Sequence, residues 1–168
     1  MIKNISQKIS IAPLQILRFP LLTPRKLLDS QKFNIRYTDP AQITEIADKL
    51  RCYRYQHALL QKEVAEHISI DRSTYIHYEE YGRDYYPIEH MEKLAELYDV
   101  PVEELLDEYN LFLYKGQGEQ IRKIRQGLGL TQKQYAEQLG VPPGTLKQWE
   151  QNRVRIFKST WEKYFQIV

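Results

Sequence analysis

Apolar residues recur at helical spacing along most of the chain that follows Pro40. One set falls on a single helical face, and a second set repeats the i, i+3, i+4, i+7 spacing of an amphipathic helix. The first set is Ile46, Leu50 and Tyr53, and the second is Met91, Leu94, Ala95 and Tyr98. A further helix is predicted to begin at residue 102 and to run towards residue 114, before two glycines. The pattern therefore predicts an all-α fold after residue 40.

Residues 1–40 show no sustained helical period, and prolines interrupt them at positions 13, 20, 24 and 40. They are predicted to form a poorly ordered N-terminal arm that holds at most one short strand. The apolar stretch 9–22 within the arm is too short and too interrupted for a membrane span, and no small-residue cleavage site follows it. The one cysteine, Cys52, excludes an internal disulfide and fits a reducing compartment, so a cytoplasmic protein is expected.

The chain contains an internal repeat. Residues 50–79 and 121–150 align without a gap at an offset of 71, with nine identities in thirty positions, where unrelated segments would share roughly two. Apolar positions correspond as well. The repeat predicts two modules of one kind, and with the arm it divides the chain into residues 1–40, 41–114 and 115–168.

The second copy predicts two short helices joined by a tight turn. Thr131 and Gln134 form a capping box, so a helix should begin at Gln132. It should end near residue 139, where Gly140 is free to adopt a left-handed conformation. Pro143 suits the first turn of the next helix, which should continue to residue 149.

These segments resemble the lambda-repressor-like, Cro-type helix-turn-helix family of DNA-binding regulators. The second copy carries the resemblance in Leu130-Thr-Gln-Lys-Gln-Tyr-Ala-Glu-Gln-Leu-Gly-Val141 and in Thr145-Leu-Lys-Gln-Trp-Glu150, and the first in Leu59-Leu-Gln-Lys-Glu-Val-Ala-Glu-His-Ile68 and in Ser73-Thr-Tyr-Ile-His-Tyr-Glu79. The resemblance covers about residues 43–107 and 118–165. It implies two tandem all-α helix-turn-helix domains, the second shortened, that bind double-stranded DNA sequence-specifically. A transcriptional regulator that reads the major groove with the third helix of each domain, without a cofactor, is expected.

The first copy departs from the family pattern at three places. Leu60 replaces the capping hydroxyl residue, and Ser69 replaces the glycine of the turn. The segment after Glu79 carries one residue more than the segment after Glu150. The second domain also lacks an evident fifth helix, so its flank is expected to pack on the first domain or on another chain.

The resemblance implies roles for two groups of residues. Arg54 with Glu79, and Arg125 with Glu150, would be scaffold ion pairs. Outward positions would contact DNA: Arg72 has the fork that suits guanine, and Arg153 and Arg155 lie where the family holds phosphate. Solvated surface is the alternative for each. The full set of expected DNA-contacting residues is Gln61, Arg72, Ser73, Thr74, His77, Gln132, Gly144, Thr145, Lys147, Gln148, Arg153 and Arg155.

Charge is divided unevenly along the chain. Residues 1–40 carry a net +5, residues 41–107 a net −8 and residues 108–168 a net +5. The basic ends are therefore expected to supply most of the affinity for DNA. An adaptor or antitoxin-like protein is the alternative, in which the acidic first module, with Tyr81, Tyr85 and Tyr86 as an interaction patch, binds a protein. A homodimer is also left open, and no membrane partner is expected.

No residue set predicts catalysis. The four histidines show no metal-ligand spacing with the cysteine, and adjacent glutamates such as Glu79 and Glu80 point about 100° apart on a helix. The chain has no phosphate-binding glycine loop and no nucleophile elbow. We therefore expect neither an enzyme nor a metal site.

Overall fold

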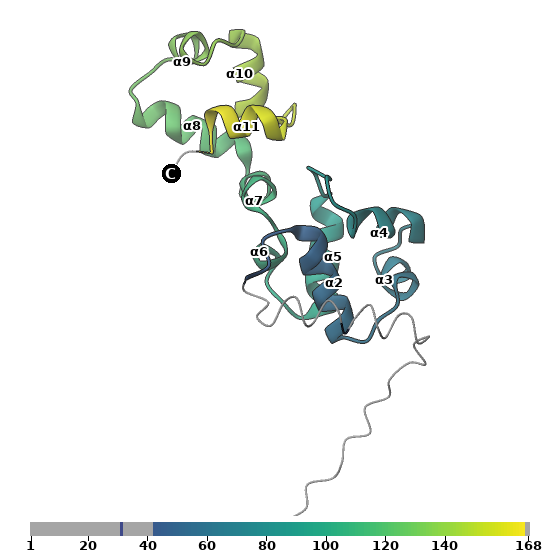
Figure 1. The fold of residues 1–168 in the computed structure, drawn as a ribbon. Coiled ribbons are helices and arrows are strands. Elements are labelled where there is room, and N and C mark those ends of the chain that lie inside the picture. Colours follow the sequence, from purple (N-terminus) through teal and green to yellow (C-terminus); the bar gives the residue numbers. More distant parts are fainter. Residues whose placement is uncertain (1–30, 32–41, 167–168) are drawn as a thin grey trace, which may run out of the picture.

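The computed structural model describes Gln31 and residues 42–166. The arm predicted over residues 1–40 lies almost wholly outside this part of the chain. Across residues 42–166 all regular structure is helical, which confirms the all-α prediction. Figure 1 shows two groups of helices, connected through α7.

The first group encloses one apolar core. Its helices are α2 (Ile46–Gln56), α3 (Gln61–His67), α4 (Arg72–Tyr78), α5 (Ile88–Tyr98) and α6 (Val102–Leu105). Leu50, Val64, Tyr75 and Leu94 are among the side chains that fill the space between them. Burial of such side chains stabilises each helix through its apolar face.

The second group repeats this arrangement. Its helices are α8 (Gln117–Gly127), α9 (Gln132–Leu139), α10 (Pro143–Glu150) and α11 (Lys158–Tyr164). The predicted starts at Gln132 and Pro143 are confirmed, and Gly140 has the left-handed φ of 67°. The core contains Trp149 and Trp161, both buried. The chain's two tryptophans therefore both lie in this second core.

Both substituted residues of the first helix-turn-helix affect its local structure. Ser69 adopts a φ of 61°, close to that of Gly140, although it carries a Cβ. Leu60 has no oxygen to cap α3, so only the Glu63 half of the capping box forms, with a carboxylate oxygen accepting from Leu60 N at 2.7 Å. In α9, Thr131 Oγ1 does accept from Gln134 N, at 3.3 Å.

The single helix expected from residue 102 to residue 114 is wrong, because the chain breaks between α6 and α7 (Glu108–Tyr114). Leu106 is extended, with ψ 151°, and Asp107 caps α7 by accepting from Asn110 N at 2.8 Å. The expectation that two glycines end the helix is right for only one of them. Gly116 has a φ of 84° and separates α7 from α8, whereas Gly118 lies inside α8.

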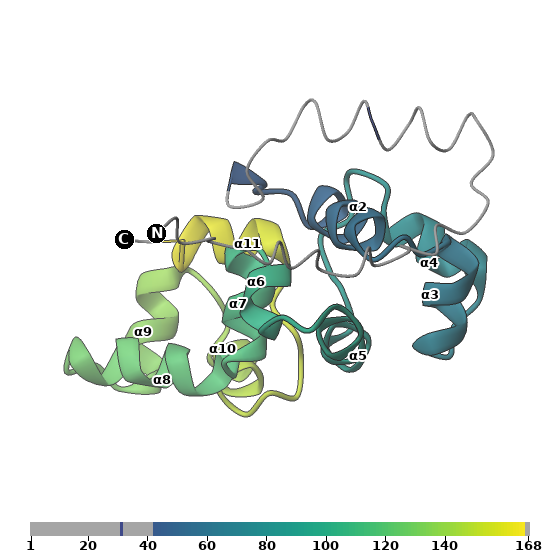
Figure 2. The same cartoon turned by 90° about the horizontal axis from the view of Figure 1, so that it is seen from below.

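Helix α7 belongs to both cores. Leu111 and Tyr114 pack against the first core, while Tyr109 and Phe112 are buried in the second. Figures 1 and 2 both show α7 between the two groups of helices. The flank of the second group is thus covered by a helix that follows the first, which is one of the two arrangements expected from the sequence.

Candidate nucleic-acid interface

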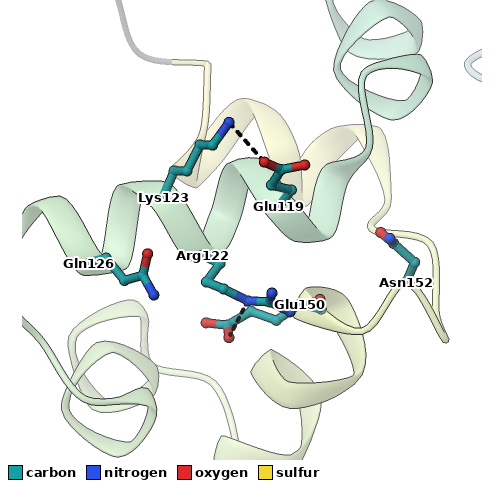
Figure 3. Close-up of a pocket in the computed structure, with 6 residues that line it drawn as sticks. All are labelled: Glu119, Arg122, Lys123, Gln126, Glu150 and Asn152. Carbon is teal, nitrogen blue, oxygen red and sulfur yellow. Dashed lines mark hydrogen bonds and ion pairs between the residues drawn. The ribbon is translucent and has the colours of Figure 1, made fainter.

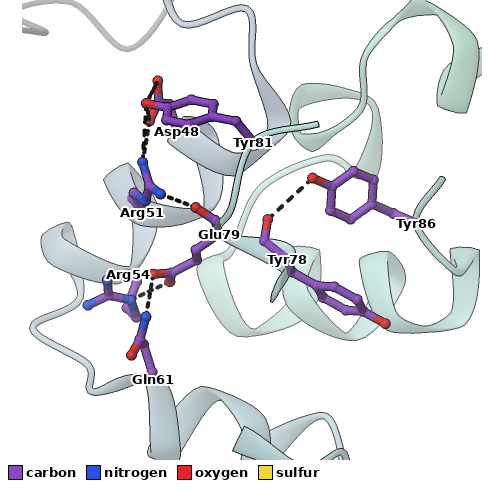
Figure 4. A network of polar contacts seen from close by, with 8 residues as sticks. All are labelled: Asp48, Arg51, Arg54, Gln61, Tyr78, Glu79, Tyr81 and Tyr86. Carbon is purple, nitrogen blue, oxygen red and sulfur yellow. Dashed lines mark hydrogen bonds and ion pairs between the residues drawn. The ribbon is translucent and has the colours of Figure 1, made fainter. Parts of the chain in front are cut away.

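A buried carboxylate fixes the helix-turn-helix of the first group. Glu79 is 3% exposed and accepts from Arg54 Nε at 2.5 Å and from Arg54 Nη2 at 2.8 Å. Gln61 Nε2 donates to the same carboxylate at 2.9 Å, and the Arg51 guanidinium donates to the Glu79 carbonyl. Figure 4 shows these side chains converging on Glu79. They connect α2, α3 and the end of α4.

The second group contains the same network at an offset of 71 residues. Glu150, also 3% exposed, accepts from Arg125 Nε at 2.6 Å and from Gln132 Nε2 at 2.8 Å. Arg122 Nη2 donates to the Glu150 carbonyl at 3.1 Å. The two scaffold ion pairs expected from the resemblance are therefore present. The sequence pattern did not predict this role for Arg51 and Arg122. The signal for it was that both copies of the repeat have arginine at this position.

The charge state of Glu150 follows from two opposed effects. Burial raises the pKa of this carboxyl, but hydrogen bonds from Arg125 and Gln132 and the nearby Arg122 charge outweigh burial and lower the pKa overall. A lowered pKa in the folded state means that the ionised form stabilises the fold. This contribution is present above the ordinary value of 4.5 and is lost as the pH falls through the folded-state pKa.

We therefore expect wild-type protein to lose its stability advantage over Glu150→Gln as the pH falls below about 4.5. Urea unfolding followed by tryptophan fluorescence at a series of pH values measures this difference, because both tryptophans lie in the second core. A difference that stays constant from pH 6 to pH 3 would contradict the assignment.

The second helix of each helix-turn-helix presents a polar face to solvent. On α4, Arg72, Ser73 and His77 are exposed, whereas Tyr75 and Tyr78 are buried. On α10, the exposed residues are Gly144, Lys147 and Gln148, and the buried ones include Leu146 and Trp149. Thr74 and Thr145 are half-buried at the edge of these faces. The structure thus places the expected contact residues of both helices on outward surfaces or at their margins.

Three of the expected contact residues already have hydrogen-bonding partners within the chain. The Nε2 groups of Gln61 and Gln132 donate to the buried glutamates, so the side chains of both residues belong to the scaffold. His77 Nδ1 lies 2.6 Å from Glu80 Oε2, on an exposed part of α4. DNA contact by these three residues remains a prediction.

The loops that follow α4 and α10 differ in length, as the sequence predicted. The left-handed residue comes three positions after Glu79, at Gly82, but two positions after Glu150, at Asn152. Arg153 and Arg155 are exposed in the second loop. The Arg155 guanidinium carbon lies 3.5 Å from the centroid of the Tyr85 ring, so this side chain is engaged by the first group of helices.

The interpretation of Tyr81, Tyr85 and Tyr86 as one interaction patch is wrong. Tyr86 is 2% exposed, and its hydroxyl donates to the Tyr78 carbonyl at 3.3 Å. Tyr81 is exposed, but its hydroxyl donates to Asp48 at 2.9 Å (Figure 4). Tyr85 is half-buried beneath Arg155. The tyrosines of the longer loop hold it against the rest of the fold. A sequence pattern does not reveal these contacts.

A hollow lined by two acidic and two basic side chains lies between α8 and the end of α10. Figure 3 shows Arg122 pointing from α8 towards Glu150, while Lys123 points to the other side and pairs with Glu119 at 2.9 Å. Gln126 and Asn152 complete the lining. Each acidic side chain of the hollow is thus paired with a basic one, so its four charged side chains balance.

Two further features are absent from the described part of the chain. Residues 42–166 contain no group of three or more His, Cys, Asp or Glu side chains placed to hold a metal ion. Within the same residues, no helix combines the length and the apolar character needed to cross a membrane.

Comparisons with known proteins agree with this architecture. Residues 47–111 match a family described as a helix-turn-helix domain, and residues 121–163 match a second one described as helix-turn-helix. The chain is similar to the cryptic phage CTXphi transcriptional repressor RstR of Vibrio cholerae, with 39% identity over 62 residues. That match covers 37% of this chain and 55% of the repressor, so the chain spans about half the length of this curated relative. No solved structure shows a significant match. The chain therefore carries two tandem helix-turn-helix domains of the lambda-repressor-like, Cro/C1 type.

Proposed function

We propose that this protein binds double-stranded DNA sequence-specifically and regulates transcription, with α10 as the principal reading helix. The observation that carries the proposal is the division of α10 into two faces. Leu146 and Trp149 are buried in the core, while Lys147 and Gln148 project from the surface of a basic domain. A helix held in this way can enter the major groove without disturbing the core. The similarity to a phage repressor supports the same function.

Each exposed residue of this face has chemistry suited to one part of a duplex. Gln148 can form paired hydrogen bonds with adenine, and Gly144 leaves room for the helix start to approach the DNA. Lys147 and Arg153 supply positive charge for phosphates. Thr145 lies at the edge of the face, and Gln132 at the start of α9 could add a contact through its amide oxygen.

The first domain contributes selectivity more than affinity. Its reading helix exposes Arg72, Ser73 and His77 on a strongly acidic background. Long-range attraction to DNA is weak there, but Arg72 can still form a short bidentate bond with guanine. If both α4 and α10 bind one duplex, the site should contain two different half-sites about one helical turn apart, roughly 34 Å. The two DNA-binding units that we propose are residues 41–114 and 115–168.

Selection of bound sequences from a pool of random duplexes tests the proposal with the full chain. We expect enrichment of one asymmetric motif, whose two parts differ because the exposed residues of α4 and α10 differ. A palindromic motif would indicate a symmetric dimer. Failure to enrich any motif would contradict sequence-specific binding.

Substitution of Lys147 by alanine should weaken binding to selected and random duplexes alike. If Lys147 contacts a phosphate, the slope of log affinity against log salt concentration should fall by about one. Titrations at several salt concentrations measure this slope. Lys123→Ala is the matched control, since it removes an exposed positive charge whose side chain points away from α10 (Figure 3). An equal loss in both variants would show that net charge alone matters.

The structure favours DNA over the adaptor alternative. The tyrosine patch that suggested a protein partner is not a free surface, because Tyr86 is buried and the Arg155 guanidinium lies over the Tyr85 ring. Both domains match helix-turn-helix families, which point to a regulator and not to an enzyme. A DNA ligand and a single buried cysteine, Cys52, suit the cytoplasm.

A further inference from the structure

Helix α7 and the residues around it form a polar joint between the two domains. On the first-domain side the central residue is Asn110, which is fully buried. Its Nδ2 donates to the Asp84 carbonyl at 2.9 Å, and its Oδ1 accepts from Tyr86 N at 3.1 Å. Asp107 also accepts from Asn110 Nδ2, at 2.7 Å. The loop that follows α4 is thereby fixed to α7.

The second-domain side of the joint uses the loop that follows α10. Tyr109 lies next to Asn110 on α7, and its hydroxyl donates to the Ile156 carbonyl at 2.6 Å. Lys158 Nζ lies 3.2 Å from Asp107 Oδ2, so the start of α11 is also tied to the cap of α7. A buried polar contact with satisfied partners holds one geometry, because any other leaves donors and acceptors unpaired.

Arg155 connects the two loops directly. Its guanidinium lies over the Tyr85 ring at 3.5 Å, and Tyr85 stands between the two residues that Asn110 holds. The loops that leave the reading helices α4 and α10 therefore meet each other on α7. Both views of the fold place α7 between the two groups of helices (Figures 1 and 2). A flexible linker would leave the distance between two DNA-binding units variable, whereas this joint does not.

We propose that the joint of Tyr85, Asp107, Tyr109, Asn110 and Arg155 fixes α4 relative to α10 and so sets the spacing at which the protein accepts two half-sites. This inference rests on the proposed DNA binding and assigns Arg155 as a positioning residue instead of a phosphate ligand. Each added base pair moves one half-site by about 3.4 Å and rotates it by roughly 34° around the duplex. A rigid pair of helices cannot follow that change without breaking joint contacts.

The test uses the full chain and the motif enriched from random duplexes, with zero to ten base pairs inserted between its two parts. Wild-type protein should lose at least about tenfold in affinity at five inserted base pairs, where the half-sites face opposite sides of the duplex, and should not recover it at ten, where they face the same side again but lie about 34 Å further apart. Tyr85→Ala should lose less than about threefold at five inserted base pairs, because its domains can turn independently. Tyr85→Phe keeps the ring beneath Arg155 and should behave as wild type. Equal spacing profiles for wild type and Tyr85→Ala would overturn the proposal.

A measurement without DNA separates failure of the joint from failure of DNA binding. Spin labels at Lys62→Cys and Lys133→Cys lie at equivalent exposed positions of α3 and α9, while the native Cys52 is buried. Pulsed electron resonance should give one narrow distance distribution, which Tyr85→Ala or Tyr109→Phe broadens and Tyr85→Phe leaves narrow. A narrow distribution in every variant would contradict the joint, whatever the DNA result. Narrow wild-type and broadened Tyr85→Ala distributions in a protein that enriches no motif would instead contradict the proposed function alone.

Discussion

Replacing Glu79 by alanine is expected to lower the free energy of unfolding of the first domain by about 3 to 5 kcal/mol. The substitution leaves Arg54 buried without its counter-charge, with a side chain only 9% exposed. Gln61 and Arg54 together lose three hydrogen bonds to the carboxylate. Removal of one partner of a buried pair costs more than the net value of the pair, because the remaining charge stays desolvated.

Circular dichroism during urea unfolding measures the loss, and tryptophan fluorescence reports separately on the second domain. Glu80→Ala is the matched control, since the neighbouring glutamate is exposed and pairs with His77 at the surface. It should change the stability by less than about 1 kcal/mol. Equal effects of the two substitutions would show that Glu79 is not the centre of the scaffold.

Gly118→Ala is expected to destabilise the second domain by about 1 to 3 kcal/mol, in spite of the high helix propensity of alanine. A Cβ at this position would lie 2.5 Å from the Glu150 carbonyl oxygen and 2.8 Å from Asn152 Oδ1. The carbonyl belongs to the backbone and cannot rotate away, so α8 and the end of α10 must separate. Gly118 N also donates to Asn152 Oδ1 at 2.8 Å, a bond that the separation would break.

Gly127→Ala in the same helix is the control for this prediction. Nothing lies within 4 Å of a Cβ at Gly127, and the residue does not require a positive φ. Alanine should therefore stabilise the domain by about 0.5 to 1 kcal/mol there. Tryptophan fluorescence during unfolding measures both variants in the second core. Changes of the same sign in the two variants would mean that the close approach at Gly118 is relieved easily.

Local signals account for what the sequence predicted correctly. The capping box at Thr131, the glycine at position 140 and Pro143 each constrain the backbone within a few residues, so the starts of α9 and α10 could be located. The repeat predicted two modules of one kind, and α3 and α4 begin at the positions equivalent to the starts of α9 and α10. The outward faces of the reading helices were implied by the resemblance to the helix-turn-helix family.

Contacts between distant residues account for what the sequence did not reveal. Tyr86 packs into the first core because Asn110, 24 positions later, holds its backbone. Arg155 stacks on Tyr85 although 70 positions separate them, and Tyr109 reaches Ile156 across 47 positions. No periodicity encodes such pairs, and the place of Tyr85 and Tyr86 in the longer loop suggested an interaction patch. The close approach of Gly118 to Glu150 is of the same kind.

Titration of the full chain with the selected duplex and with a scrambled duplex of equal length and composition tests sequence-specific DNA binding most directly. We predict that the selected duplex is bound at least about 10³-fold more tightly at the same salt concentration, as is usual for specific over non-specific sites. Both affinities should fall with added salt, because basic side chains such as Lys147 displace counterions from phosphates. Equal affinity for the two duplexes, or no binding to either, would contradict the account.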